Sequence, residues 1–290
     1  MNPPVFHQQR DQLLYPKILW NRPLSRHGAG RLLVVGGYQA DFSQPTAMFT
    51  LAMAAGAGEC IVALPDSLAR LLTGTPSIVF VPSSPSGSLG RDALGQVLNA
   101  VDDANGVALG ANLSNNSETA VLIERLVQET TKPLIIFAEA LPALQFNIRL
   151  VTARERTLMI VTMPEVFKLA AQLGLSIHIR RDGGLMNKLE IIKIVKEVMA
   201  ADMVVYGAET IVAVGHELSV TPTNPVLSRL PTAYYSVLSV FWLQHSAKPF
   251  EALTTAAWVL AYAGNGLNQQ ELPTVGGTAK LVAKALEQGE

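Results

Sequence analysis

The sequence has little charge, a single cysteine and no long apolar run. Charged residues make up 16% of its 290 positions and the formal net charge is -1, with no basic block that would bind a phosphate backbone. Every apolar run is well short of the roughly 20 residues needed to cross a bilayer. We therefore expect neither a nucleic-acid partner nor a membrane. The N-terminus lacks a basic start followed by an apolar stretch, which favours a cytoplasmic protein.

The scarcity of cysteine and histidine limits metal and thiol chemistry. Cys60 cannot form an internal disulfide, and it stands in an apolar run over residues 60–64 that predicts a buried strand. A reactive thiol is the alternative, but no neighbour in the sequence would lower its pKa. The histidines do not show the spacing of metal ligands, so no metal site is predicted. They are His7, His27, His178, His216 and His245.

Hydrophobic residues make up 49% of the chain and fall into short runs that alternate with helical segments. The predicted strands cover residues 31–37, 60–64, 77–81, 106–110, 134–137 and 158–162. The predicted helices between them cover residues 43–55, 66–72, 91–101, 117–129 and 164–173. This alternation is typical of a parallel sheet with helices on both faces, so we predict an α/β fold.

The pattern changes after residue 175. A helix over residues 187–200 places apolar side chains on one face and Lys188, Lys193 and Lys196 outside it. A strand and its hairpin partner are predicted over 203–206 and 210–214, followed by a polar loop and helices over 232–244, 250–263 and 278–287. Residues 1–30 form a lead-in with a short helix near 11–19. No linker divides the chain, so a single domain over residues 1–290 is expected.

The start of the first predicted strand carries the first specific motif. Residues 21–37 read Asn-Arg-Pro-Leu-Ser-Arg-His-Gly-Ala-Gly-Arg-Leu-Leu-Val-Val-Gly-Gly, and Ala-Ala-Gly-Ala-Gly follows at 54–58. In order and spacing these segments resemble the NAD(P)H-hydrate dehydratases, ribokinase-like enzymes that use ADP or ATP to repair hydrated nicotinamide cofactors. The resemblance extends to about Gly264. It implies a ribokinase-like three-layer α/β/α sandwich, ATP or ADP with Mg²⁺, a ligand like NAD(P)H hydrate, and a homo-oligomer.

The phosphate-binding motif of that family is replaced here. The family carries Gly-Thr-Gly-Asp at a helix start, where backbone N–H groups cradle phosphate and the aspartate accepts a proton. Tyr234 lies ten residues after Asn224, and the segment Pro-Thr-Ala-Tyr over residues 231–234 therefore stands in the place of the family's Gly-Thr-Gly-Asp motif. Thr232 is kept. Pro231 has no N–H, and a tyrosine with a usual pKa of about 10 is a poor base.

Four other motifs of the family differ as well. Asp-Ala-Asp-Ala-Leu reads Phe-Ala-Glu-Ala-Leu over 137–141, which leaves Glu139 as an acidic candidate. His-Pro-Gly-Glu becomes Met-Pro-Glu over 163–165, and Lys-Gly becomes Tyr206-Gly207. Gly-Pro-Gly-Leu-Gly becomes Gly-Ala-Asn-Leu-Ser over 110–114. For Glu165 a favourable charge in the first turn of a helix is the preferred interpretation, whereas for Glu139 a structural and a catalytic role stay open.

The resemblance thus gives a set of positions expected near a nucleotide. They are Gly36, Gly37, Gly110, Asn112, Glu165, Asn224 and Thr232, with Tyr234 at the position of the family's aspartate and Glu139 as the other catalytic candidate. We predict a catalytically impaired relative that retains weak nucleotide binding. The alternatives are an active dehydratase or small-molecule kinase with a rearranged site, and a structural oligomer, which the apolar composition would suit.

Overall fold

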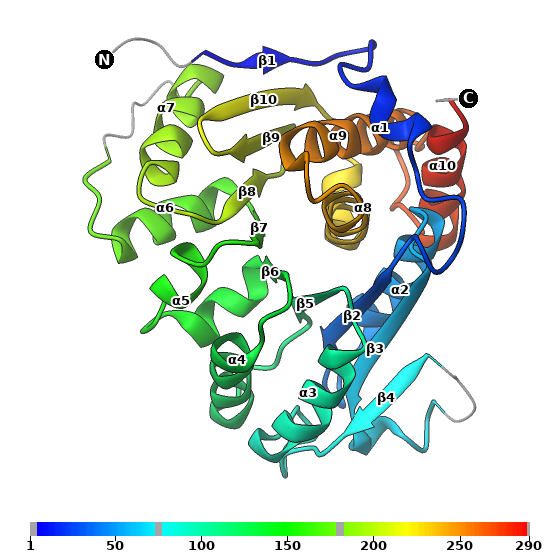
Figure 1. The fold of residues 1–290 in the computed structure, drawn as a ribbon, viewed down its shortest axis with the longest axis vertical. Helices are drawn as coiled ribbons and strands as arrows, with labels where there is room; N and C mark the ends of the chain where they lie inside the picture. Colours follow the sequence, from blue (N-terminus) through cyan, green and yellow to red (C-terminus); the bar gives the residue numbers. More distant parts are fainter. Residues whose placement is uncertain (1–4, 73–76, 178–182, 289–290) are drawn as a thin grey trace.

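A ten-stranded sheet with helices on both faces forms the framework of the computed structural model, which describes residues 5–72, 77–177 and 183–288 (Figure 1). The strand order is β1-β10-β9-β8-β7-β6-β5-β2-β3-β4. The strands are β1 (His7–Gln8), β2 (Arg31–Gly36), β3 (Glu59–Pro65), β4 (Ile78–Val81), β5 (Gly106–Ala111), β6 (Leu134–Phe137), β7 (Thr157–Val161), β8 (Asp202–Val205), β9 (Glu209–Val214) and β10 (Glu217–Pro222). The helices are α1 (Pro16–Trp20), α2 (Ser43–Ala54), α3 (Leu94–Asp102), α4 (Ser117–Glu129), α5 (Arg149–Thr152), α6 (Met163–Gln172), α7 (Leu185–Lys196), α8 (Pro231–Gln244), α9 (Pro249–Asn265) and α10 (Val275–Glu287).

The strands from β2 to β8 run parallel, and β9 pairs antiparallel with both β8 and β10. The chain moves outward from β2 through β3 to β4. It then returns to the other side of β2 and continues through β5 to β8. The direction of winding therefore reverses between β2 and β5. In open α/β sheets, ligands bind outside the carboxyl ends of the strands at such a reversal.

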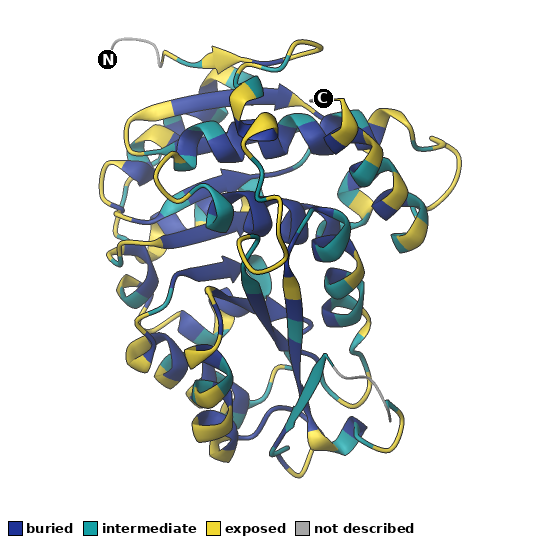
Figure 2. Ribbon diagram, turned by 45° about the vertical axis from the view of Figure 1, so that its right-hand side comes forward, coloured by how far each residue is buried: buried dark blue, intermediate teal, exposed yellow. Residues whose placement is uncertain are grey.

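The side chains of the central strands alternate between two cores. In β2, Leu33 and Val35 join the core under α3 to α7, whereas Leu32 and Val34 join the core under α1, α2, α8, α9 and α10. This alternation follows from the two-residue period of a strand. Figure 2 shows the central strands buried and the exposed residues gathered on loops and outer helix faces. Helix α8 is buried over residues 232–242, so it forms part of the core.

The predicted α/β class and mostly parallel sheet are confirmed, with several local corrections. The helix predicted over residues 66–72 is only a single 3₁₀ turn at Asp66–Leu68, and the helix predicted near 11–19 is α1, which begins at Pro16. Strands β1 and β10 and helix α5 were not predicted. Both strands are short or strongly polar, and α5 has four residues, too few to show a helical period.

Lys196 is also a correction, because it is buried although the helical pattern placed it outside. Its Nζ donates a hydrogen bond to the carbonyl of Ala201 just after α7, and burial lowers its pKa. Cys60 is buried as predicted, and burial raises its pKa to about 12, which makes the thiol inert. In the described ranges, no helix is long and apolar enough to cross a membrane. The predictions that rest on residues 1–4 and on His178 lie outside the described residues.

The two strands at the reversal are in close contact at Gly36. A Cβ atom added to Gly36 would lie 2.0 Å from the carbonyl oxygen of Ala111. That same oxygen accepts a hydrogen bond of 2.8 Å from the backbone N–H of Gly37, which has a left-handed φ of +75°. The contact between the two strands therefore requires a glycine at position 36, and the left-handed backbone favours one at position 37.

We predict that Gly36→Ala lowers the free energy of unfolding by about 3 kcal/mol, because the added methyl group would overlap backbone that has no room to move. Urea denaturation measures the change. The matched control is Gly95→Ala in α3, where an added Cβ meets no atom within 4 Å. This control should stabilise the fold by about 0.5–1 kcal/mol. Equal unfolding midpoints for Gly36→Ala and wild type would contradict the close contact.

Candidate functional site

Four aromatic side chains pack together at the carboxyl ends of the central strands. Phe137 ends β6, Tyr206 follows β8, and Tyr234 and Tyr235 lie in the first turn of α8. We call these residues the aromatic cluster. The rings of Phe137 and Tyr235 are stacked with centroids 4.1 Å apart, and those of Tyr206 and Tyr234 are stacked at 4.7 Å. Tyr206 also meets Tyr235 edge to face at 6.0 Å, so the four rings form one continuous unit.

The hydroxyl groups of this cluster are enclosed. Tyr206 and Tyr235 share a hydrogen bond of 3.2 Å between their hydroxyls. The Tyr234 hydroxyl faces Thr223 and Thr210 but makes no hydrogen bond of normal geometry, and its side chain is fully buried. Burial raises the pKa of all three phenols above its usual value. They therefore stay protonated at neutral pH and cannot accept a proton.

The start of α8 has few groups that could hold an anion. Pro231 occupies the first helical position and has no N–H, and Leu230 before it offers no side-chain cap. The N–H of Ala233 already donates to the carbonyl of Leu230. Thr232 is buried, and its hydroxyl has no hydrogen-bond partner. Thr232 and Tyr234 are thus two buried polar side chains of this turn whose hydroxyls have no hydrogen-bond partner among the described residues.

Glu139 is the carboxylate that reaches the reversal between β2 and β5. It lies in a 3₁₀ segment, Ala138–Leu144, directly after β6. Its Oε2 accepts a hydrogen bond of 2.8 Å from the backbone N–H of Asn112, and its Oε1 accepts one of 2.7 Å from Gln44. Asn112 has a left-handed φ of 51°, a conformation that asparagine adopts more readily than most residues. Burial raises the pKa of Glu139.

The positions predicted near a nucleotide do not all face one cavity. Gly110 has a φ of +115° and packs on the backbone of Ala140. Glu165 caps α6, where its Oε2 accepts hydrogen bonds from the N–H and the hydroxyl of Thr162. The preferred structural interpretation of Glu165 therefore fits its contacts. Asn224 uses its amide to bond Val226 and Gly264, although it also lines a cavity of about 600 Å³ beside Arg10 and Asn265.

A separate cavity of about 430 Å³ lies beside the aromatic cluster at the carboxyl ends of β7 and β8. Tyr206 and Gly207 line it, as does Ser228 in the 3₁₀ turn Leu227–Arg229 that precedes α8 in the sequence. Lys188 of α7 lines it as well, and its Nζ lies 2.9 Å from Glu209. Sequence reasoning placed Lys188 on an outer helix face but missed its place at this cavity. The sequence pointed to this region only through the Tyr206-Gly207 pair. The ion pair between Lys188 and Glu209 could not be predicted, because it joins residues from different elements.

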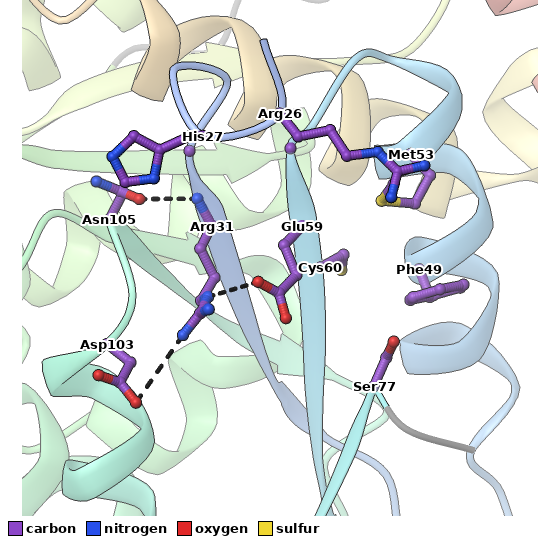
Figure 3. Close-up of a pocket in the computed structure, with 12 residues that line it drawn as sticks. Arg26, His27, Arg31, Phe49, Met53, Glu59, Cys60, Ser77, Asp103 and Asn105 are labelled. Atoms are coloured by element: carbon purple, nitrogen blue, oxygen red, sulfur yellow. Dashed lines mark hydrogen bonds and ion pairs between the residues drawn. The ribbon is translucent and has the colours of Figure 1, made fainter. Parts of the chain in front are cut away.

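The opposite, amino-terminal edge of the sheet also has a cavity, of about 620 Å³ (Figure 3). Its central cation, Arg31, lies 2.8 Å from Glu59 and 3.9 Å from Asp103. Phe49 and Met53 of α2 form an apolar wall. None of the residues predicted near a nucleotide lines this cavity. In the part of the chain that is described, no group of three or more His, Cys, Asp or Glu side chains is arranged to hold a metal ion.

Comparison with curated proteins supports the resemblance seen in the sequence. The chain is 30% identical over 188 residues to a bifunctional NAD(P)H-hydrate repair enzyme from Moorella thermoacetica, a match that covers 63% of this chain and 34% of that protein. It is 28% identical over 147 residues to the enzyme of the same name from Methanothermobacter thermautotrophicus, covering 49% and 28%. The chain thus spans about a third or less of the curated relatives it matches. No family model matches the chain.

Solved structures confirm the ribokinase-like fold. A ribokinase-like superfamily protein from Enterococcus faecalis superposes with a TM-score of 0.74 and 14% identity, covering 97% of this chain and 96% of that one. An ADP/ATP-dependent NAD(P)H-hydrate dehydratase from Bacillus subtilis, co-crystallised with ATP and Mg²⁺, gives a TM-score of 0.64 at 14% identity, with all of both chains covered. The chain therefore has a ribokinase-like fold and resembles NAD(P)H-hydrate dehydratases.

Removing the Tyr234 hydroxyl should not weaken the fold. Tyr234→Phe leaves both stacked rings in place and deletes a buried oxygen that has no partner, so we expect an unchanged or slightly higher free energy of unfolding. Tyr235→Phe is the matched comparison, because it breaks the hydrogen bond to Tyr206 and should cost about 1 kcal/mol. Chemical denaturation of the two variants compares them directly. A larger loss for Tyr234→Phe than for Tyr235→Phe would show that its hydroxyl has a partner.

Glu139→Gln should gain stability relative to wild type as the pH rises. The raised pKa of Glu139 means that the native state holds the proton more tightly than the unfolded chain does. Its stabilising effect is therefore present at low pH and is lost as the pH rises through the native pKa. Unfolding measured between about pH 4 and pH 7 tests this, with exposed Glu155→Gln as a control for net charge. A difference in the free energy of unfolding between Glu139→Gln and wild type that does not change with pH would contradict this prediction.

Proposed function

We propose that the protein is a catalytically impaired relative of the NAD(P)H-hydrate dehydratases that binds a nucleotide weakly at the carboxyl ends of its parallel strands. The aromatic cluster is the observation that carries this proposal. Three of its members stand at positions where the resemblance expects charged residues. Phe137 stands in place of an aspartate, Tyr206 in place of a lysine and Tyr234 in place of the catalytic aspartate. These side chains are in contact with one another or with Tyr235, so the replacements form one packed unit.

The chemistry of phosphoryl transfer supports the loss of catalysis. Such reactions need a group that orients the nucleophile and accepts its proton, and little else from the protein beyond positioning and charge. The phenols of the cluster are kept protonated by burial. The two acidic candidates, Glu139 and Glu165, are engaged by backbone N–H groups. Neither of these candidates is therefore free to act as the base, and Glu209, which also lines the cavity, is paired with Lys188.

Weak nucleotide binding is supported by the cavity beside the cluster. Lys188 would attract phosphate there. The Thr232 hydroxyl at the start of α8 is buried and does not line this cavity, so a phosphate would reach it only if the turn opened. Two features oppose tight binding. Glu209 already neutralises Lys188, and Pro231 removes one backbone donor. Mg²⁺, when present, would bind with the phosphates, because an ion of this kind is commonly held by substrate oxygens and one or two carboxylates.

The rival proposal is an active dehydratase or kinase with a rearranged site. The observation in its favour is Glu139, a carboxylate with a raised pKa at the reversal between β2 and β5. Groups with raised pKa values gather at catalytic sites. For Glu139 to act as a base, its carboxylate would have to leave Asn112 or Gln44, which hold both oxygens.

We also propose a cytoplasmic homo-oligomer that folds as one domain. Large apolar side chains exposed on the surface support self-association. The most exposed in the described residues are Val5, Leu24, Leu71, Phe146 and Leu272. Gel filtration showing a monomer across a range of concentrations would remove the oligomer from the proposal.

Incubation of purified protein with hydrated NADH, Mg²⁺ and either ATP or ADP tests the proposed loss of activity. The expected result is no turnover above the uncatalysed rate. Turnover that disappears in Glu139→Gln would establish the rival proposal instead.

Calorimetry with ADP and ATP tests the proposed binding. We expect dissociation constants in the millimolar range, weakened about tenfold by Lys188→Gln, which removes a charge-assisted contact to phosphate. Lys193→Gln is the matched control, because Lys193 lies on the same helix with an exposed side chain. Equal effects of the two substitutions, or no heat at all, would contradict nucleotide binding at this cavity.

A further inference from the structure

A cavity of about 490 Å³ lies at the end of α8 remote from the aromatic cluster. The residues that introduce four adjacent strands line it: Asn105 before β5, Pro133 before β6, Arg156 before β7 and Asp202 at the start of β8. Trp242 in the last turn of α8 forms the facing wall. We call it the Asp202 cavity. It shares only Asn105 with the cavity in Figure 3 and no residue with the candidate nucleotide site.

The carboxylate of Asp202 is held in place but only half satisfied. Its Oδ2 accepts a hydrogen bond of 2.9 Å from the indole N–H of Trp242, which is 5% exposed. Its Oδ1 has no hydrogen-bond partner among the described residues. The charge of buried Lys196 acts on Asp202, but its Nζ donates to the carbonyl of Ala201, and the two side chains form no salt bridge. One oxygen of a fixed carboxylate therefore remains available.

The end of α8 adds further negative potential at this cavity. The carbonyl groups of Trp242, Leu243 and Gln244 accept no backbone hydrogen bond within the described chain. Unpaired carbonyls give the C-terminus of a helix a partial negative charge. The last turn of α8 has no basic residue to offset it. A carboxylate and a helix C-terminus together favour a cationic group such as an ammonium.

Arg156 supplies the opposite charge from another side of the cavity. Its φ of 53° is left-handed, a conformation that costs energy for an arginine and that is concentrated at functional sites. Arg154 holds this turn by donating to the carbonyls of Thr130 and Lys132. The Arg156 side chain is exposed and forms no ion pair within the described residues. It lines the same cavity as Asp202, and the two side chains form no ion pair with each other.

We propose that the Asp202 cavity binds a small zwitterion, with an ammonium group at Asp202 and Trp242 and a carboxylate at Arg156. The ligand class is that of a short amino acid whose two charges are separated by an aliphatic chain. This site is independent of the proposed nucleotide binding, because it lies at the other edge of the sheet. The cavity in Figure 3 lacks this arrangement, since Glu59 and Asp103 already flank its Arg31.

The indole N–H resonance of Trp242 gives a direct readout, because this group donates to Asp202. We would titrate ¹⁵N-labelled protein with glycine, β-alanine and γ-aminobutyrate, and with butylamine and butyrate as analogues that carry one charge each. At least one of the amino acids should shift the Trp242 resonance saturably at millimolar concentration. The analogues with one charge should bind at least about tenfold more weakly, because each loses one ion pair.

Two variants and one control test the contributions of the two charged side chains one at a time. Asp202→Asn keeps the shape and the acceptor for Trp242 but should weaken binding of that amino acid about tenfold. Arg156→Asn should do the same, and asparagine tolerates the left-handed backbone, so this exposed variant keeps the test valid if Asp202→Asn does not fold. Arg26→Gln, in the cavity of Figure 3, should leave binding unchanged.

The proposal is overturned if none of the three amino acids shifts the Trp242 resonance. It is equally overturned if butylamine binds as tightly as the best amino acid, or if Arg26→Gln weakens binding as much as Arg156→Asn. Activity or nucleotide binding at the other edge of the sheet does not affect any of these outcomes.

Discussion

The stacking of Tyr206 on Tyr234 determines what the carboxyl end of this sheet can do. It joins the loop after β8 to the first turn of α8, and Tyr235 extends it to Phe137 at the end of β6. Stacked aromatic pairs contribute about 0.5–1.5 kcal/mol each beyond the burial of their surface. These residues therefore stabilise the fold at the place where, on the proposed correspondence, an active relative would need polar groups. A polar site there would carry the cost of desolvated charge, which this chain avoids.

If the proposed correspondence with the dehydratase motifs holds, the cluster also gives their replacement a common physical cause. Once Tyr234 is buried in place of a carboxylate, a lysine at residue 206 would have no partner and an aspartate at residue 137 would face aromatic rings. Tyr206 and Phe137 fill the space instead. The remaining acids are then held by backbone donors, Glu139 by Asn112 and Glu165 by the start of α6. A nucleotide would meet a pocket with one neutralised lysine, which fits weak binding without chemistry.

The sequence was sufficient to predict the parallel sheet, because its apolar runs are short and regularly spaced, and α4 and β6 begin and end where the pattern placed them. The position of Lys196 was not predictable, because its partner is a carbonyl beyond the helix. For the site, the motif comparison identified Tyr206, Tyr234 and Glu139 as single positions. It could not show that two of them stack or that Glu139 bonds Asn112, since these contacts join residues far apart in the chain. Whether the predicted positions bind a nucleotide stays a prediction.

A crystal structure of the protein soaked with ATP and Mg²⁺ tests the central claim most directly. Our account predicts that Tyr206 and Tyr234 remain stacked, that Glu139 keeps both hydrogen bonds, and that any nucleotide density is partial and lies beside Lys188. An ordered triphosphate at the start of α8, with the tyrosines displaced and the Glu139 carboxylate turned toward the terminal phosphate, would contradict it.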